Sequence, residues 1–280
     1  MSNTELIAPL PAPIPEKIVR PGRDLVLDLV VLALLFLVVS LVVPAAFIIV
    51  RIFQQGLTLS ALQGMDQTAL LKLVGVDGIV TLLFIQNAVF VGLPVARVIR
   101  LQRKPPRAIG LQFEKPLRLI ATGIGLGVLV LISNILFSSL FAFFDIRQNQ
   151  AAQYPLFKGD YLGQFFFLMG AALFAPIGEE VLFRGYIFNT LRRIWGEKRW
   201  GIVGAYGLSA FLFLLAHSGA ASEGLIALLL PAFVMGLLLA WGMHRTGSLL
   251  PCVIAHGMNN GLALLALLAC VNGAVPCPNF

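Results

Sequence analysis

The sequence predicts an all-α, polytopic membrane protein with about seven transmembrane helices, and three observations support this fold class. Hydrophobic residues make up 59% of the 280 residues, whereas charged residues make up only 12%. Soluble domains contain roughly 45–50% apolar and about 25% charged residues, and a soluble chain with this composition could not cover its surface with polar side chains. The third observation is that the apolar residues gather in stretches of roughly the 20 residues needed to cross a bilayer.

Seven apolar stretches are candidates for membrane spans. They lie near residues 25–50, 79–98, 119–144, 163–191, 203–218, 224–242 and 249–271. The fourth stretch contains charged residues and the fifth is short, so the ends of these two are the least defined. The first stretch is longer than the core of a signal peptide, which has about 7–15 residues. We therefore expect it to remain in the protein as a span.

The distribution of Lys and Arg predicts the orientation of these spans. The flanking segments contain, in chain order, 3, 2, 7, 2, 4, 0, 1 and 0 Lys or Arg residues, and high and low counts alternate strictly. Because cytoplasmic flanks are enriched in Lys and Arg, we expect the N-terminus in the cytoplasm and the C-terminus outside. Topology thus accounts for the net charge of +7, and we expect no nucleic-acid partner. The expected location is a plasma membrane, the inner membrane of a bacterium.

The chain divides into four parts by composition. Residues 1–24 form a Pro-rich segment that we expect to be a disordered cytoplasmic tail, and residues 25–160 hold the N-terminal spans. Residues 161–272 form a helical core that contains the polar motifs described below, and residues 273–280 form a short tail. Three cysteines do not make a disulfide framework. Cys270 and Cys277 could pair on the predicted outer side, but two unpaired thiols are the favoured interpretation.

Ionisable residues inside spans are costly and usually indicate a function. The fourth span contains Glu179, Glu180 and Arg184. Glu180 and Arg184 are four residues apart, so they share a helix face and can form an ion pair. Glu179 lies about 100° around the helix from Glu180, which leaves its carboxylate free for chemistry. A buried polar network that only holds helices together is the structural alternative.

Two further motifs bring polar residues into other spans. His217 follows Phe213 by four residues in the fifth span, and Asn260 follows His256 by four residues in the seventh. At about 1.5 Å per residue from the cytoplasmic edges, Glu179 and Asn260 lie about 18 Å deep, His217 about 21 Å and His256 about 12 Å. These side chains therefore fall in one layer near the middle of a hydrocarbon core about 30 Å thick.

This set of residues is suited to hydrolysis by an activated water molecule. A carboxylate beside two imidazoles can activate water directly or through a bound metal ion. Glu179, His217 and His256 could supply three ligands to Zn²⁺, and a metal-free mechanism stays equally open. The amide of Asn260 can stabilise the oxyanion of a tetrahedral intermediate. The sequence contains no His-Glu-x-x-His motif, which excludes a zincin-type metalloprotease.

The three motifs, in this order on separate spans, resemble those of the CAAX-protease and bacteriocin-processing family (CPBP, or ABI). This family includes the type II CAAX prenyl endopeptidases, and the resemblance covers residues from about 168 to 268. It implies an intramembrane endopeptidase in which Glu179 and His217 activate the water. It implies further that His256 and Asn260 stabilise the oxyanion and that Glu180 and Arg184 shape the site. The substrate it implies is a peptide or protein within the lipid bilayer, with or without a lipid anchor.

Two alternatives remain open at this level. Gly207-Leu208-Ser209 loosely resembles the Gly-x-Ser motif of rhomboid serine proteases, with Ser209 as the nucleophile, although a small residue on a helix more often serves packing. The chain could instead be a non-catalytic membrane protein with an immunity, scaffolding or transport role. Under any interpretation, we expect the Gly-x-x-x-Gly pairs at 123–127 and 257–261 to allow close helix packing.

Overall fold

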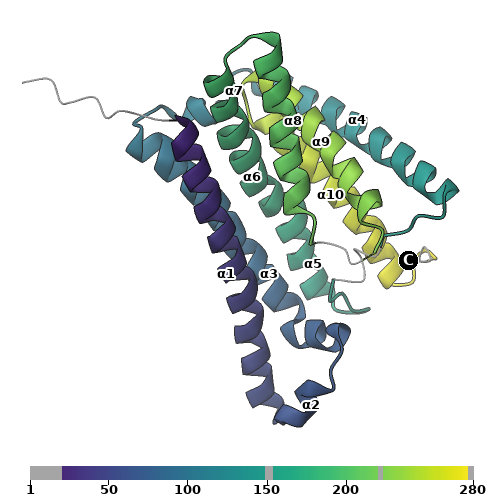
Figure 1. Cartoon of the computed structure of the whole chain (residues 1–280). Coiled ribbons are helices and arrows are strands. Elements are labelled where there is room, and N and C mark those ends of the chain that lie inside the picture. The colour runs from purple at the N-terminus through teal and green to yellow at the C-terminus, as the bar shows by residue number, and fades with distance from the viewer. Residues whose placement is uncertain (1–20, 149–153, 220–222, 277–280) are drawn as a thin grey trace, which may run out of the picture.

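The computed structural model describes residues 21–148, 154–219 and 223–276 (Figure 1). The structure is 82% helix, and the described residues contain no strand. Seven of its helices are long and apolar enough to cross a membrane, which confirms the predicted fold class and number of spans. The spans are Pro21–Gln55, Ala69–Leu101, Pro116–Phe143, Tyr161–Trp195, Arg199–Ala216, Leu225–Thr246 and Leu250–Val271.

The structure subdivides these spans into shorter elements. In chain order they are α1 (Pro21–Gln55), α2 (Leu59–Gln63), α3 (Gln67–Pro94), η1 (Val95–Leu101), η2 (Pro106–Ile109), α4 (Pro116–Phe143), α5 (Tyr161–Met169), η4 (Gly170–Phe174), α6 (Ala175–Glu180), η5 (Val181–Phe188), α7 (Asn189–Trp195), α8 (Arg199–Ala216), α9 (Leu225–Thr246) and α10 (Leu250–Val271). Helix α1 begins at Pro21, so residues 21–24 of the expected tail are helical. Residues 1–20 lie outside the described part of the chain.

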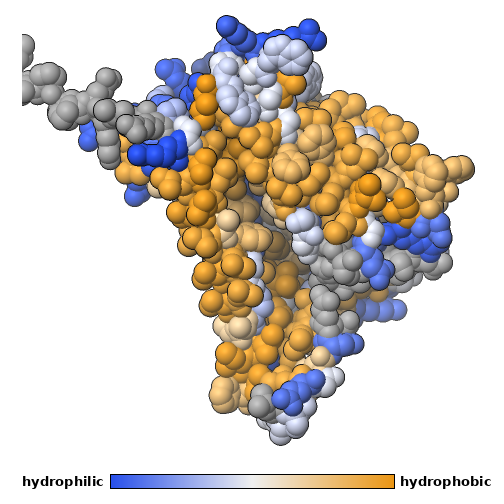
Figure 2. All heavy atoms as spheres, viewed as in Figure 1, coloured by the Kyte–Doolittle hydropathy of each residue, from blue (hydrophilic) through white to orange (hydrophobic). Residues whose placement is uncertain are grey.

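The outer surface of the helix bundle is apolar. Figure 2 shows hydrophobic residues over the middle of the molecule and hydrophilic ones at its two ends. Helix α1 illustrates this pattern, because large side chains such as Leu37 (55% exposed) and Leu41 (63%) point away from the bundle. Such exposure would be unfavourable in water but matches the hydrocarbon of a bilayer. The chain is therefore an integral, multi-pass membrane protein.

The fourth span is one continuous helical rod that two π-helical segments interrupt. The short α6, which contains Glu179 and Glu180, lies between the π-helical segments η4 and η5. Pro176 lies near the start of α6, and because it has no backbone N–H it cannot donate a hydrogen bond to the preceding turn. Wide turns of this type are frequent at functional sites. The local sequence thus places the two carboxylates at a break in the regular helix.

Glycines allow α4 to approach α10 closely. A Cβ on Gly123 would lie 3.0 Å from Cα of Pro251, and a Cβ on Gly127 would lie 3.3 Å from Cα of Ala255. On the other face of α10, a Cβ on Gly257 would lie 2.7 Å from the carbonyl oxygen of Ala172. These approaches agree with the packing role expected for the Gly-x-x-x-Gly pairs. They hold α10, which contains His256 and Asn260, tightly between α4 and η4.

An acidic residue near the start of α1 ties that helix to the rest of the bundle. Asp28 is buried and accepts hydrogen bonds from the Arg97 guanidinium, with Nε at 2.7 Å, and from the hydroxyl of Tyr186. The three residues come from α1, η1 and η5. A buried charge that is paired and hydrogen-bonded escapes most of the cost of desolvation. This cluster was not anticipated from the sequence.

We expected Cys270 and Cys277 to be unpaired thiols, and the structure differs from this expectation at Cys270. Cys252 is a free, fully buried thiol, whereas Cys270 at the end of α10 is disulfide-bonded. The interpretation of two unpaired thiols is therefore wrong for Cys270. Its proposed partner, Cys277, lies outside the described residues.

Candidate active site

The Glu179 carboxylate lies between two histidines that come from different helices. Its Oε2 is 3.8 Å from Nε2 of His256 on α10 and 3.9 Å from Nε2 of His217, which caps the end of α8. The same Oε2 atom is buried and has no hydrogen-bond partner. A buried polar atom without a partner is unusual, and two polar groups about 3.8 Å apart can share a water molecule that lies about 2.8 Å from each. The three side chains therefore outline a place for a water molecule.

The local structure fixes the orientation of His217. Its Nδ1 lies 2.9 Å from the carbonyl oxygen of Phe213. A carbonyl oxygen can only accept, so Nδ1 must be the donor. In the neutral ring this leaves the lone pair of Nε2 facing Glu179. The ring of Phe213 also packs on His217 with their centroids 4.6 Å apart, so the Phe-x-x-x-His spacing supplies both the partner and the packing surface of the imidazole.

Glu180 supports the second histidine rather than facing the space beside Glu179. Its Oε1 accepts from Nδ1 of His256 and from Nη1 of Arg184, each at 2.8 Å. The predicted ion pair between Glu180 and Arg184 is therefore present, and both side chains are at most 1% exposed. The guanidinium also lies 4.3 Å from the centroid of the Phe213 ring, a favourable cation–π contact. Because Nδ1 of His256 donates to Glu180, its Nε2 is left to face Glu179.

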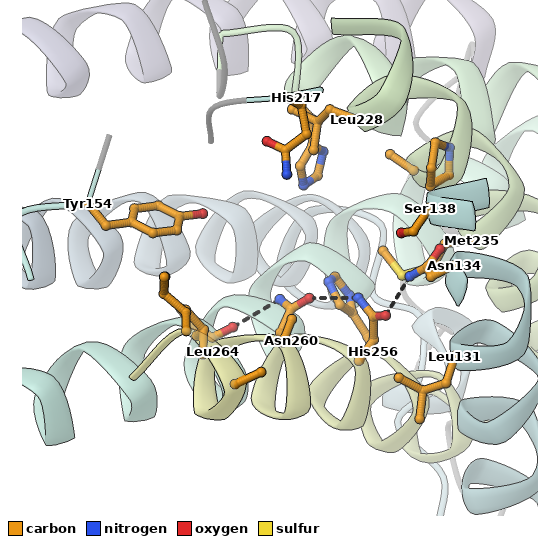
Figure 3. A pocket seen from close by; sticks show the side chains of 18 of the residues that line it. Leu131, Asn134, Ser138, Tyr154, His217, Leu228, Met235, His256, Asn260 and Leu264 are labelled. Atoms are coloured by element: carbon orange, nitrogen blue, oxygen red, sulfur yellow. Dashed lines mark hydrogen bonds between the residues drawn. The ribbon is translucent and has the colours of Figure 1, made fainter. Parts of the chain in front are cut away.

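A chain of three asparagines leads to Asn260 (Figure 3). Nδ2 of Asn134 on α4 donates to Asn259 at 2.6 Å, and Nδ2 of Asn259 donates to Oδ1 of Asn260 at 3.2 Å. Nδ2 of Asn260 in turn donates to the carbonyl oxygen of Ala171 at 3.0 Å. An amide nitrogen has two hydrogens, so Asn260 retains one donor for another partner. The sequence motif identified Asn260, but not the chain of amides that fixes which way its nitrogen points.

Four of the six candidate site residues line one cavity of about 870 Å³, whereas Glu180 and Arg184 lie behind its wall. The four lining residues are Glu179, His217, His256 and Asn260. Asn134 and Asn259 also line it, so the asparagine chain lies along its wall. Pockets that bind small molecules usually measure about 300–1,000 Å³. The cavity is therefore large enough to admit part of a polypeptide.

Tyr154, in the loop before α5, is a cavity residue that the sequence did not reveal. Its ring packs on Phe167 with the centroids 5.0 Å apart, and in Figure 3 its hydroxyl points into the space between His217 and Asn260. Burial, and secondarily the charge of Glu179, raise the pKa of Tyr154 to about 12. The phenol is thus a neutral hydrogen-bond donor at ordinary pH. A tyrosine in a loop carries no spacing signal, so only the folded chain places it here.

The donor atoms are of the right type for zinc, but their spacing does not match the ion. Tetrahedral Zn²⁺ with bonds of about 2.0–2.1 Å places neighbouring ligand atoms about 3.3 Å apart. The distances from Glu179 to the two histidines are 3.9 and 3.8 Å. Among the residues that the structure describes, no three His, Cys, Asp or Glu side chains are close enough together to hold a metal ion. As the side chains lie, Oε2 of Glu179 is therefore farther from the two Nε2 atoms than neighbouring zinc ligands are from one another.

Ser209 lies outside this cavity. Its hydroxyl is buried and donates to the carbonyl oxygen of Phe183 at 3.1 Å, which is a packing role between α8 and η5. It does not line the cavity, and its hydrogen bond to Phe183 is to a backbone carbonyl rather than to a histidine. The geometry therefore gives no support to a serine nucleophile at this position.

Part of the chain, including most of the cavity residues described above, matches a known protein family. Residues 161–262 match the family described as "Type II CAAX prenyl endopeptidase Rce1-like". This helical core is therefore similar to the type II CAAX prenyl endopeptidases. No curated protein and no solved structure matches the chain.

All six candidate site residues lie within the segment that matches the CAAX-protease family. Asn134 and Tyr154 lie outside it, in the N-terminal part of the chain, yet they line the same cavity. The first spans therefore complete the walls of the CAAX-protease-like core rather than forming a separate unit.

Proposed function

We propose that the protein is an intramembrane endopeptidase that hydrolyses a peptide bond with a water molecule activated by Glu179. The observation that supports this most strongly is the unpartnered Oε2 of Glu179, which faces Nε2 of both histidines at the wall of a large cavity. Oε2 of Glu180 also has no hydrogen-bond partner, but Glu180 does not line the cavity, and its Oε1 is held by Arg184 and His256. Of the two carboxylates, it is therefore Glu179 that presents an unpartnered oxygen at the cavity wall. The match to the CAAX-protease family supports the same reaction class.

In the proposed first step, Glu179 removes a proton from the water molecule. The water oxygen forms a bond to the carbonyl carbon of the substrate, and the π electrons of the carbonyl move to its oxygen. His217 orients the water through Nε2, which its bond to Phe213 leaves available. General-base assistance of this kind contributes about 10²–10⁴-fold to a rate.

The oxyanion formed in this step needs hydrogen-bond donors in a region that excludes water. The free N–H of Asn260 is one donor, and a protonated Nε2 of His256, with Glu180 against its Nδ1, is the other. The intermediate then collapses: the carbon–nitrogen bond breaks, and the proton taken by Glu179 passes to the leaving nitrogen. The products are one new carboxyl group and one new amine, so one water molecule is consumed per bond.

We derive no step through a metal ion, because the spacing around Glu179 does not match the zinc geometry. The proposed substrate is a peptide or protein within the bilayer, and the proposed location is the inner membrane of a bacterium. This location is supported by the multi-pass architecture and by the charge pattern that predicts a cytoplasmic N-terminus.

The substitution Glu179→Gln tests the base directly, since it keeps the shape of the side chain and removes its basicity. The purified wild type and variant would be incubated in detergent with a pool of tagged membrane peptides that includes a farnesylated CAAX peptide. We expect the variant to lose cleavage and to keep the thermal stability of the wild type. Glu114→Gln, at an exposed position outside the spans, is the matched control and should cleave normally.

Cleavage by Glu179→Gln at the wild-type rate would show that the base has been assigned wrongly. The non-catalytic alternative would be favoured by two results together. The wild type would cleave no peptide of the pool, and the variant would differ from it only in unfolding more easily.

A further inference from the structure

The cavity extends from the catalytic side chains towards one end of the helix bundle. Its deep part includes Glu179 and His256, and at the other extreme it is lined by residues of two chain segments that lie beyond the spans, the connection between α4 and α5 and the segment after α10. These residues are Gln148 after α4, Tyr154 before α5, and Val275 and Pro276 after α10. The opening therefore lies at the end of the bundle where α4 and α10 finish and α5 begins.

The opposite end of the bundle carries most of the basic residues. The segments at 97–118 and 192–199 contain seven and four Lys or Arg residues, and both join spans at the end away from the opening. None of these basic residues lines the cavity. Because cytoplasmic flanks are the ones enriched in Lys and Arg, the opening faces the extracytoplasmic side.

The charges around the cavity restrict what can occupy it. Among its described lining residues there is no Lys or Arg, and Glu179 is the one acidic side chain. The nearby Arg184 is buried against Glu180 and does not reach the cavity. A carboxylate brought close to the site would lose water and meet a like charge without a basic partner, which is unfavourable in low-dielectric surroundings. The residues on either side of the cleaved bond should therefore be uncharged.

Helices α4 and α10 supply both polar and apolar side chains to the cavity, whereas the lining residues of α9 are all apolar. Asn134, Ser138 and Ser139 on α4 and Asn259 on α10 supply amides and hydroxyls, whereas α9 supplies apolar residues such as Leu228 and Met235. An extended polypeptide inside a bilayer must find partners for its backbone N–H and C=O groups. Amides and hydroxyls on one wall can supply these partners, while the apolar residues contact the side chains of the occupant.

We propose that the cavity admits an uncharged, apolar stretch of a membrane-inserted polypeptide from the extracytoplasmic half of the bilayer. This inference rests on the proposed endopeptidase activity and specifies its substrate. The cleaved bond then lies in the interior of the substrate chain, far from a free C-terminal carboxylate. The same geometry makes a cytoplasmic, carboxylate-ending peptide a poor substrate.

The side from which the cavity opens can be tested without any assay of activity. Ser139→Cys places a thiol on the exposed cavity wall, and Glu114→Cys places one in an exposed segment at the basic end. Cells expressing each variant would be converted to spheroplasts and treated with a membrane-impermeant maleimide, with the unsubstituted protein as background. We expect labelling of Ser139→Cys in intact spheroplasts and of Glu114→Cys only after the membrane is opened. The reverse pattern would overturn the proposed direction.

The preference for an uncharged segment is tested with three probes on the purified protein. They are a farnesylated CAAX peptide with a free carboxylate, the same peptide ending in a carboxamide, and a single-span apolar peptide whose ends lie far from its centre. We expect the carboxamide and the single-span peptide to be cleaved about tenfold faster than the free acid, because neither brings a carboxylate to Glu179. Cleavage of the free acid at an equal or greater rate would overturn the inference.

These outcomes separate the substrate inference from the proposed function. If Glu179→Gln abolishes cleavage but the free acid is the preferred substrate, the protein is an endopeptidase and the inference about its substrate is wrong. If the wild type cleaves none of the three peptides, the proposed function itself is contradicted, and the labelling experiment still decides on which side the cavity opens.

Discussion

One oxygen of Glu180 holds two residues from different parts of the chain. Its Oε1 is 2.8 Å from Nη1 of Arg184, one turn along the same rod, and 2.8 Å from Nδ1 of His256 on α10. The ion pair of the fourth span is therefore also the anchor of a histidine in the seventh. This arrangement leaves Glu179, the neighbour of Glu180, as the carboxylate that lines the cavity, where its Oε2 has no hydrogen-bond partner.

Breaking the Glu180–Arg184 pair should destabilise the protein strongly. Arg184→Leu removes the buried cation and leaves Glu180 without its charge partner, which costs about 3–5 kcal/mol for buried pairs. The double variant Glu180→Gln/Arg184→Leu should recover part of this loss, because it removes the uncompensated charge. Thermal unfolding in detergent measures both effects. Equal stability of wild type and Arg184→Leu would contradict the structural role assigned to the pair.

The asparagine chain predicts unequal effects on catalysis. Asn260→Ala removes an oxyanion donor, and such losses lower kcat by about 10²–10³-fold. Asn134→Ala removes only the hydrogen bond that orients Asn259, so we expect a loss of about tenfold in kcat with KM unchanged. Cleavage kinetics on a single-span peptide would measure both values.

The control for this prediction uses another asparagine and a double variant. Asn189 donates to the carbonyl oxygen of Gly185 away from the cavity, so Asn189→Ala should cleave at the wild-type rate. If Asn134 acts through Asn260, then Asn134→Ala should have no further effect in the Asn260→Ala background. Independent, additive losses would show that Asn134 acts in some other way.

Removal of metal ions should not abolish cleavage. The distances of 3.8 and 3.9 Å around Glu179 suit a shared water molecule better than zinc ligands. Purified protein would be treated with a strong chelator, its metal content measured by mass spectrometry, and its cleavage rate compared before and after. A loss of activity that follows the loss of bound zinc, and that added zinc restores, would refute the metal-free mechanism.

Tyr154→Phe should lower the rate of cleavage by about three- to tenfold, the effect of losing one ordinary hydrogen bond to the substrate. The pKa of Tyr154 is raised to about 12, so its hydroxyl stays protonated over the range in which the enzyme would be assayed. The ratio of the wild-type and variant rates should therefore be constant with pH up to about pH 10, the pKa of a free tyrosine. A ratio that changes between pH 6 and 9 would show that another group is responsible.

The raised pKa also predicts how Tyr154 affects stability. Between about pH 10, where an unfolded tyrosine ionises, and about pH 12, where the folded one does, the folded state retains the proton and the unfolded state has lost it. Stability must therefore fall as the pH rises through this window. Thermal unfolding of the wild type should show a steeper alkaline decrease than that of Tyr154→Phe.

Much of the architecture could be predicted from local patterns. The seven apolar stretches indicated the seven helices that the structure contains, because the length of an apolar run must match the thickness of the bilayer. The four-residue spacing of Glu180 and Arg184 predicted their ion pair for a similar reason, since the helix itself brings such residues together. The motif spacing also identified the side chains that line the cavity near Glu179.

Local sequence patterns thus predict the helices and the residues that face one another along a single helix. They do not predict that Glu180 binds His256, that Asn134 on α4 reaches Asn259, or that Asp28 joins Arg97 and Tyr186. Each of these contacts joins residues far apart in the chain. Their distances depend on how closely the helices pack, as the glycines between α4 and α10 illustrate, and no local spacing encodes that approach.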